Sequence, residues 1–223
     1  MEAKSFVAEF VGTFTLVFVG VGAIAAAGSA GLVGVALAHG LAIAIMVTAT
    51  AAVSGGHLNP AVSIGLWTVG KLSSSRLVSY LIAQVTGGLA GAFLILLALP
   101  MAVREVSIGT PTVAAGVGSG SALLLEAVLT FFLVFAVYGT AVDRRAPKLG
   151  GLFIGLAVTM GILVAGPATG AALNPARHLG PALLAGGEYL AQFWIYWLGP
   201  VAGGIIAAQV YRNTLEERSA GPN

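Results

Sequence analysis

The sequence predicts an all-α membrane protein, and three observations support this prediction. The 223 residues are 58% hydrophobic and only 8% charged, whereas soluble domains carry about a quarter charged residues. Apolar stretches recur along the whole chain, and several exceed the roughly 20 residues that a helix needs to cross a bilayer. The alternation of apolar and polar residues typical of a membrane β-barrel is absent. We therefore expect the lipid bilayer to be the solvent of this chain.

Six apolar segments are predicted to span the membrane as helices. They are Ser5–Ala27, Leu32–Val53, Arg76–Leu99, Ser121–Val142, Gly151–Ala165 and Tyr189–Tyr211. The first segment is too long for the core of a signal peptide, so we expect it to be retained. The chain has no cysteine, which excludes disulfides, thiolate metal sites and thiol catalysis. We find no motif for a metal, a cofactor or a catalytic dyad.

Basic residues gather in the connections on one side of the predicted helices. They are Lys4, Lys71, Arg76, Arg144, Arg145, Lys148, Arg212 and Arg218. The loops of the opposite side offer only Arg104, with Arg177 set aside. Because Lys and Arg in short loops stay in the cytoplasm, we expect both termini to be cytoplasmic. The bias explains the net charge of +2, so no nucleic-acid partner is needed, and the short tails favour a prokaryotic cell membrane.

The sequence contains an internal duplication. Three pairs of matching segments lie 115 to 117 residues apart: Ala8-Glu9-Phe10 with Leu125-Glu126-Ala127, Asn59-Pro60-Ala61 with Asn174-Pro175-Ala176, and Gly87-Gly88 with Gly203-Gly204. We expect one domain over residues 1–223, with repeats of about 1–100 and 119–223 and a connector over 101–118. Each repeat holds three spanning segments, so the second must enter the membrane from the opposite side. Inverted repeats place a site near the membrane midplane, between interrupted helices.

Each Asn-Pro-Ala triplet begins an apolar stretch that is too short to cross a bilayer. These stretches are Pro60–Gly70 and Pro175–Gly186. Asn is favoured at the N-cap and Pro at the first helical position, so we expect two half-helices that start there. The backbone before each start is irregular, which is tolerated at membrane depth only inside protein or beside a water-filled cavity. We expect the half-helices to meet at the midplane beside such a cavity.

A lumen of this kind would pass neutral molecules and stop protons. If the side-chain oxygens of Asn59 and Asn174 cap their own helices, their NH2 groups point into the lumen as donors. A water that accepts from both amides cannot accept from its neighbour, which interrupts proton hopping, and the positive helix N-termini oppose cations. The carbonyls expected to line the lumen as acceptors are those of Gly56, His57, Leu58, Gly170, Ala171 and Ala172.

The segments Ser54–Val62 and Asn174–Arg177 resemble the paired signatures of the aquaporin, or major intrinsic protein, family, and the resemblance extends over essentially the whole chain. It implies six tilted helices and two half-helices around each pore, and a homotetramer of such subunits. It also implies a passive water channel in the bilayer rather than an enzyme, and one with no cofactor.

The resemblance also places four residues at the outer constriction of the pore: His39, Ile162, Ala171 and Arg177. The usual water-selective pattern has an aromatic residue in place of His39 and a histidine in place of Ile162. The set found here is more similar to that of some plant vacuolar members, several of which pass ammonia or urea as well as water. The arginine is expected to donate to solutes and to repel cations.

Two acidic residues, Glu9 and Glu126, occupy matching positions in apolar helices. We expect each carboxylate to accept hydrogen bonds from the backbone of a reentrant loop. A proton relay, as in a transporter, would need a chain of titratable groups, and we find none.

Two alternatives to a water channel with some ammonia permeability remain open. One is a broader facilitator of solutes such as glycerol or urea, and the other is a secondary transporter built from inverted repeats. Glycerol channels of the family tend to have Asp, a basic residue and a Pro-Leu pair where this chain has His178, Ala182 and Tyr196-Trp197. These differences argue against a dedicated glycerol channel.

Overall fold

The computed structural model of the protein describes residues 2–147 and 149–217. Within these residues, six helices are long and apolar enough to cross a membrane, as predicted. They are α1 Glu2–Ala25, α2 Gly31–Ser54, α4 Ser74–Ala98, α6 Ser119–Val137 with a π-helical turn over Tyr138–Val142, α7 Gly150–Thr169 and α10 Phe193–Thr214. The shorter helices are α3 Pro60–Thr68, α5 Pro100–Glu105, α8 Pro175–Ala185 and α9 Gly187–Ala191.

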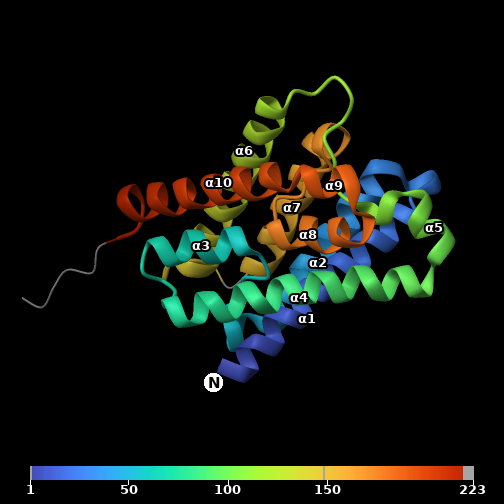
Figure 1. Cartoon of the computed structure of the whole chain (residues 1–223). Helices are drawn as coiled ribbons and strands as arrows, with labels where there is room; N and C mark the ends of the chain where they lie inside the picture. Colours follow the sequence, from blue (N-terminus) through green and yellow to red (C-terminus); the bar gives the residue numbers. More distant parts are fainter. Residues whose placement is uncertain (1, 148, 218–223) are drawn as a thin grey trace, which may run out of the picture.

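The helices pack as an inverted repeat in which the two halves exchange their half-helices. α1 packs on α4, and its counterpart α6 packs on α10, while α2 and α7 pack against each other. The half-helix α3 packs on α10 and the half-helix α8 packs on α4, so each is held by the last long helix of the other repeat. Figure 1 shows α3 and α8 lying end to end between α4 and α10.

Glycine allows the half-helices to approach these long helices closely. A Cβ atom on Gly65 of α3 would lie 2.7 Å from the carbonyl oxygen of Gly204 in α10. A Cβ atom on Gly180 of α8 would lie 2.5 Å from the carbonyl group of Gly88 in α4. Both contacts are to backbone atoms, which cannot move aside as a side chain can. The half-helices are therefore fixed by direct backbone-to-backbone packing.

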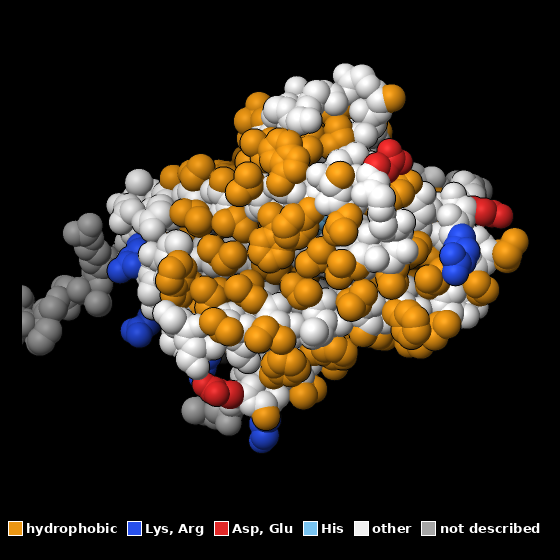
Figure 2. Space-filling view, in the orientation of Figure 1, with side chains coloured by type: hydrophobic (Ala, Val, Ile, Leu, Met, Phe, Trp, Pro, Cys, Tyr) orange, Lys and Arg blue, Asp and Glu red, His pale blue; other side chains and the backbone are white. Residues whose placement is uncertain are grey.

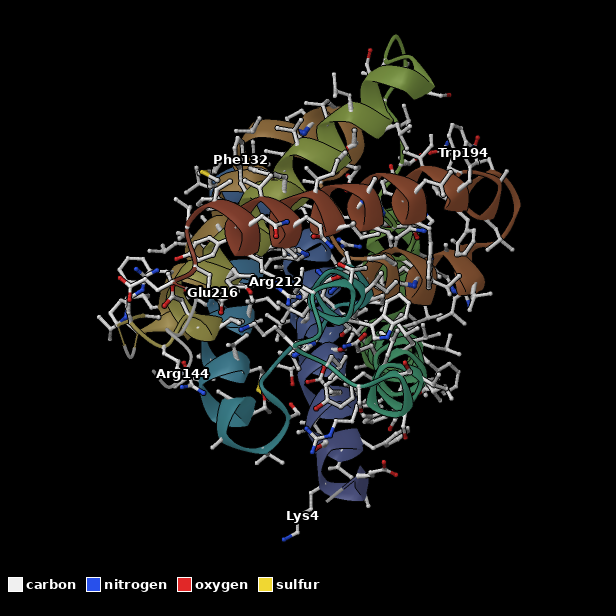
Figure 3. The ribbon with its side chains drawn as sticks, turned by 90° about the vertical axis from the view of Figure 1, so that its left-hand side faces the viewer. Lys4, Phe132, Arg144, Trp194, Arg212 and Glu216 are labelled. Carbon is white, nitrogen blue, oxygen red and sulfur yellow. The ribbon has the colours of Figure 1, made fainter. Side chains whose placement is uncertain are left out.

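Apolar side chains cover the flank of the molecule, and basic side chains gather at one end. The first residues of α1 lie at the bottom of Figure 1, and the last of α10 lie at its left. Figure 2 shows a broad apolar band, with most of the visible Lys and Arg side chains beyond its left and lower edges. Figure 3 views that end, the terminal face, with Lys4, Arg144 and Arg212 labelled. The predicted contributors Lys148 and Arg218 lie outside the described residues.

The terminal face is tied together by ion pairs and hydrogen bonds. Glu216, just after α10, accepts from the ammonium of Lys71 at 2.5 Å and from the hydroxyl of Tyr138 at 2.7 Å. Asp143 accepts two side-chain hydrogen bonds from Arg145. These bonds hold the pKa of the Asp143 carboxyl well below its usual value.

The structure corrects two predicted helix boundaries and adds one helix that the sequence did not predict. The fifth spanning helix ends at Thr169 rather than Ala165, because its last turn is anchored to other elements through Thr169. The last span is broken at Gln192, whose side-chain oxygen accepts from the backbone N–H of Val113 at 2.8 Å. The connector also contains a helix, α5, which begins with Pro100 at its first position.

Candidate functional site

The two half-helices begin where the sequence predicted. The side-chain oxygen of Asn59 accepts from the backbone N–H of Ala61 at 2.8 Å, and Pro60 occupies the first position of α3. The side-chain oxygen of Asn174 accepts from the N–H groups of Ala176 and Arg177 at 3.0 and 3.2 Å, with Pro175 first in α8. Both caps satisfy N–H groups that a helix start leaves without partners.

Each asparagine amide also joins the two repeats. The Nδ2 of Asn59 donates to the carbonyl of Leu173 at 2.8 Å, and the Nδ2 of Asn174 donates to the carbonyl of Leu58 at 2.9 Å. One of the two N–H bonds of each amide is therefore used inside the protein, which the sequence analysis did not anticipate. Because an NH2 group has two donors, each amide retains one more.

The Leu58 carbonyl does not serve as the free acceptor that the sequence analysis expected. It accepts from Asn174 and also from the hydroxyl of Thr13 at 3.2 Å. A carbonyl oxygen has two lone pairs, so both are occupied. The expectation was wrong because the sequence could not show that the opposite asparagine reaches this atom.

The reentrant loops adopt a strained backbone conformation. Leu58, Ala171 and Leu173 have positive φ angles of 53°, 44° and 50°. For residues other than glycine, such angles cost of order 1–3 kcal/mol each and persist only where surrounding structure enforces them. The loops therefore need strong external partners.

Glu9 and Glu126 are those partners, and both are fully buried. Glu9 accepts from the backbone N–H groups of His57 at 2.9 Å and Leu58 at 2.6 Å, and also from Ser54 and Gln84. Glu126 accepts from the backbone N–H groups of Ala172 at 3.0 Å and Leu173 at 2.8 Å, and from the hydroxyl of Thr169. These backbone bonds are of the kind that the sequence analysis proposed for the two carboxylates.

The four residues of the predicted constriction lie together and are almost fully buried. His39, Ile162, Ala171 and Arg177 line the same central cavity. The Nδ1 of His39 lies 2.8 Å from the carbonyl of Val35, which can only accept, so we assign the proton to Nδ1. Its Nε2 is then an acceptor for the Arg177 guanidinium at 3.3 Å.

The connector holds the other side of the Arg177 guanidinium. Its Nη1 donates to the carbonyl of Gly109 at 2.9 Å. Gly109 follows Ser107 and Ile108, which also have positive φ angles. This contact could not be predicted from the sequence, because an isolated glycine in an irregular connector gives no signal of what its carbonyl will meet.

The central cavity shares lining residues with two further cavities. His39, Ile162 and Arg177 also line a second cavity, together with the connector residues Gly109 and Thr110. Val47 is shared with a third cavity beside the connection from α6 to α7. Six apolar residues that line the central cavity were not predicted from the sequence: Leu16, Ile43, Val62, Leu133, Ile154 and Val158.

The residues expected to supply carbonyls are distributed unevenly among these cavities. His57, Ala171 and Ala172 line the central cavity, and Gly170 lines the second one. Gly56 and Leu58 are among the lining residues of neither. Asn59 and Asn174 both line the central cavity, so the two half-helix starts lie beside the same lumen.

Six membrane-spanning helices in an inverted repeat, with two half-helices meeting beside a narrow apolar lumen, define a membrane channel. The family comparison agrees: the model of the major intrinsic protein family matches residues 1–211. The chain therefore belongs to the major intrinsic protein, or aquaporin, family. At that level it is a passive channel for water or small solutes rather than an enzyme.

Known relatives of this chain include plant proteins and a solved parasite structure. The chain is 43% identical to aquaporin TIP4-4 of Zea mays, over 93% of this chain and 85% of the relative. It is 40% identical to aquaporin TIP2-1 of Arabidopsis thaliana, over 94% and 86% of the two chains. The X-ray structure of the aquaglyceroporin from Plasmodium falciparum superposes with a TM-score of 0.88 at 27% identity, covering 96% of this chain and 97% of that one.

Proposed function

We propose that this channel conducts water together with ammonia and excludes protons and ions. The observation that supports ammonia is the composition of the constriction. The imidazole of His39 and the guanidinium of Arg177 bond to each other, while the side chains of Ile162 and Ala171 are apolar. A small neutral solute loses little free energy when it gives up its hydration there. An ion would lose its water shell without gaining ligands that replace it.

Proton exclusion is proposed from the two asparagine amides. Each retains one N–H donor beyond the bond that it makes to the opposite loop. A water molecule that accepts a hydrogen bond from each amide cannot also accept one from a neighbouring water. The chain of hydrogen bonds along which protons hop is therefore interrupted. The N-termini of α3 and α8 add roughly half a positive charge each at the same point.

Stopped-flow light scattering on proteoliposomes tests the proposal directly. We expect fast osmotic shrinkage with a low activation energy, faster alkalinisation of the lumen in an ammonium gradient, and no proton conductance. Liposomes without protein are the control. Proton movement driven by a solute gradient would contradict the proposal and favour a coupled transporter.

Replacing His39 by Phe should reduce ammonia permeability more than water permeability. The phenyl ring cannot accept the hydrogen bond from Arg177, so the guanidinium loses the partner that holds it at 3.3 Å. The guanidinium then keeps its bond to the Gly109 carbonyl, while the phenyl ring is bulkier than imidazole and offers no polar atom to a passing ammonia molecule. We expect the ratio of ammonia to water permeability to fall about tenfold, equivalent to about 1.4 kcal/mol in barrier height.

Leu41→Phe is the matched control for His39→Phe. Leu41 lies on the same helix but is 56% exposed on the outer surface, so the same aromatic ring should leave both permeabilities unchanged. An unaltered ratio in His39→Phe would remove His39 from the selectivity argument.

A broader solute facilitator is the second candidate function. It is favoured by the structural similarity to an aquaglyceroporin and by the small Ala171 side chain next to Arg177. Glycerol efflux from the same proteoliposomes separates the two candidates, and we expect it to be slow relative to water.

We further propose a homotetramer in a prokaryotic cell membrane with both termini in the cytoplasm. The basic terminal face supports this orientation, although the relatives named above are plant proteins. Cross-linking in native membranes would report the oligomer. Labelling of an Arg144→Cys variant from either side of the membrane would report the orientation.

A further inference from the structure

The two repeats each place one imidazole against an equivalent tyrosine, but the histidines come from different elements. In the first repeat the ring belongs to His57 in the reentrant loop, and in the second it belongs to His178 in α8. Position 57 corresponds to 172 and position 63 to 178, by the offset of 115 residues that relates Asn59 to Asn174. The pairs are therefore His57 with Ser63, and Ala172 with His178.

In the first repeat the histidine supports the loop and also reaches the lumen. The ring of His57 lies edge-on to Tyr80 at 5.2 Å between ring centres, and its Nδ1 lies 3.1 Å from the hydroxyl of Ser63. Tyr80 in turn donates to the carbonyl of Ser54 at 2.6 Å, at the start of the loop. His57 also lines the central cavity. His57 therefore contacts Tyr80 and Ser63 behind the loop and is also a lining residue of the lumen.

In the second repeat the support comes from behind the loop. The ring of His178 is fully buried and stacks on Tyr196 at 4.1 Å between ring centres, with an angle of 15° between the planes. Tyr196 donates to the carbonyl of Thr169 at 2.7 Å, the counterpart of the Tyr80 bond. Ala172, whose side chain is only a methyl group, packs in the same buried cluster as Tyr196 and is also a lining residue of the central cavity.

The imidazole nitrogens of His178 have no protein hydrogen-bond partner within the described residues. Buried polar atoms are normally hydrogen-bonded, but the structure shows no polar contact that holds this ring. The ring is instead held by its shape and by its flat contact with Tyr196.

We propose that His178 is a positioning residue that supports the second reentrant loop through Tyr196 and so permits alanine at position 172. The lumen wall between Asn174 and the constriction is then wider and more apolar than its counterpart in the first repeat. His178 thus sets which solutes pass without touching them. The expected effect on selectivity rests on the proposed function, but the expected coupling in stability between positions 172 and 178 does not rest on it.

The test is a double-mutant cycle on the full-length protein. Ala172→His alone places a second imidazole beside His178 and should lower the melting temperature, because a packed interior does not accept extra volume. His178→Ser alone leaves a void behind the loop, and should lower it by about 3 °C or more. The double variant Ala172→His with His178→Ser rebuilds the arrangement of the first repeat, so both losses should be largely recovered.

The permeability of the double variant separates a selectivity role from a purely structural one. Its lumen would carry one extra imidazole, so methylamine permeability should fall about tenfold relative to water permeability, equivalent to about 1.4 kcal/mol in barrier height. If the losses simply add and the double variant is the least stable, or if it recovers stability with an unchanged permeability ratio, the proposal is wrong.

His178→Phe provides a second, independent variant. Phenylalanine keeps the flat contact with Tyr196 and removes the two nitrogens, so we expect an unchanged or higher melting temperature and water permeability within about twofold of the parent. A large loss in this variant would show that the nitrogens hold a bound water, and would overturn the packing role. Because melting temperatures need no transport assay, a parent protein that failed to conduct water would sink the proposed function and leave this coupling measurable.

Discussion

Glu126→Leu is expected to abolish folding of the second reentrant loop and with it the channel. The carboxylate accepts from the N–H groups of Ala172 and Leu173 and from the hydroxyl of Thr169, all buried. A buried donor without an acceptor costs about 1–3 kcal/mol, so the two backbone N–H groups would cost about 2–6 kcal/mol, while the Thr169 hydroxyl can turn to the Ala165 carbonyl at 3.4 Å. A soluble protein is stable by only about 5–15 kcal/mol in total, and the loop also carries strained φ angles that these bonds help to enforce.

The measurement is the melting temperature in detergent together with water permeability in proteoliposomes. Glu105→Leu is the matched control, since Glu105 is exposed in the connector and should tolerate the change. Glu126→Gln should give an intermediate loss, because the amide keeps one acceptor oxygen and adds donors that the loop cannot use. A Glu126→Leu protein as stable as the parent would mean that the loop does not depend on this carboxylate.

Gly180→Ala is expected to displace α8 and reduce water permeability at least about tenfold. The added methyl group would lie 2.5 Å from the carbonyl group of Gly88, well inside van der Waals contact, and the atoms that it meets belong to the backbone of a packed helix. Overpacking of this kind typically costs 1–3 kcal/mol. Arg177 lies three residues earlier on the same half-helix, so a shift of α8 also moves the guanidinium at the constriction.

Gly120→Ala is the control that isolates close packing from the loss of a glycine. Gly120 is also helical, but a methyl group there would meet nothing within 4 Å. Because alanine is the better helix former, this variant should be as stable as the parent or slightly more so. Equal behaviour of the two variants would refute the importance of the contact between α8 and α4.

The spanning helices, the inverted repeat and the two half-helix starts could be predicted because each has a local signal. A bilayer demands long apolar helices, and the Asn-Pro pair caps a helix by contacts within three residues. The ends of α7 and α10 were less predictable. Pro167 lies inside α7 rather than ending it, because Thr169 in the last turn is held by Glu126 and Tyr196, which are far away in the sequence.

At the site, the sequence identified the residues but not all of their partners. Repetition at a fixed offset identified Asn59, Asn174, Glu9 and Glu126, since a duplication places equivalent residues at equivalent points. It could not show that each asparagine amide crosses to the opposite loop, or that Leu58 thereby loses its free carbonyl. Such contacts join atoms more than 100 residues apart, and no periodic pattern records them.

The sequence by itself therefore determined that this is a membrane protein of two inverted halves, and where its half-helices begin. Those properties follow from hydrophobic length, from capping chemistry and from repetition. Only the tertiary structure decided which residues meet around the lumen. It showed that Arg177 is shared between His39 and Gly109, and that His57 contacts Tyr80 edge-on while His178 stacks flat on Tyr196. These arrangements depend on packing between helices of different repeats, where shape and unsatisfied hydrogen bonds select the neighbours.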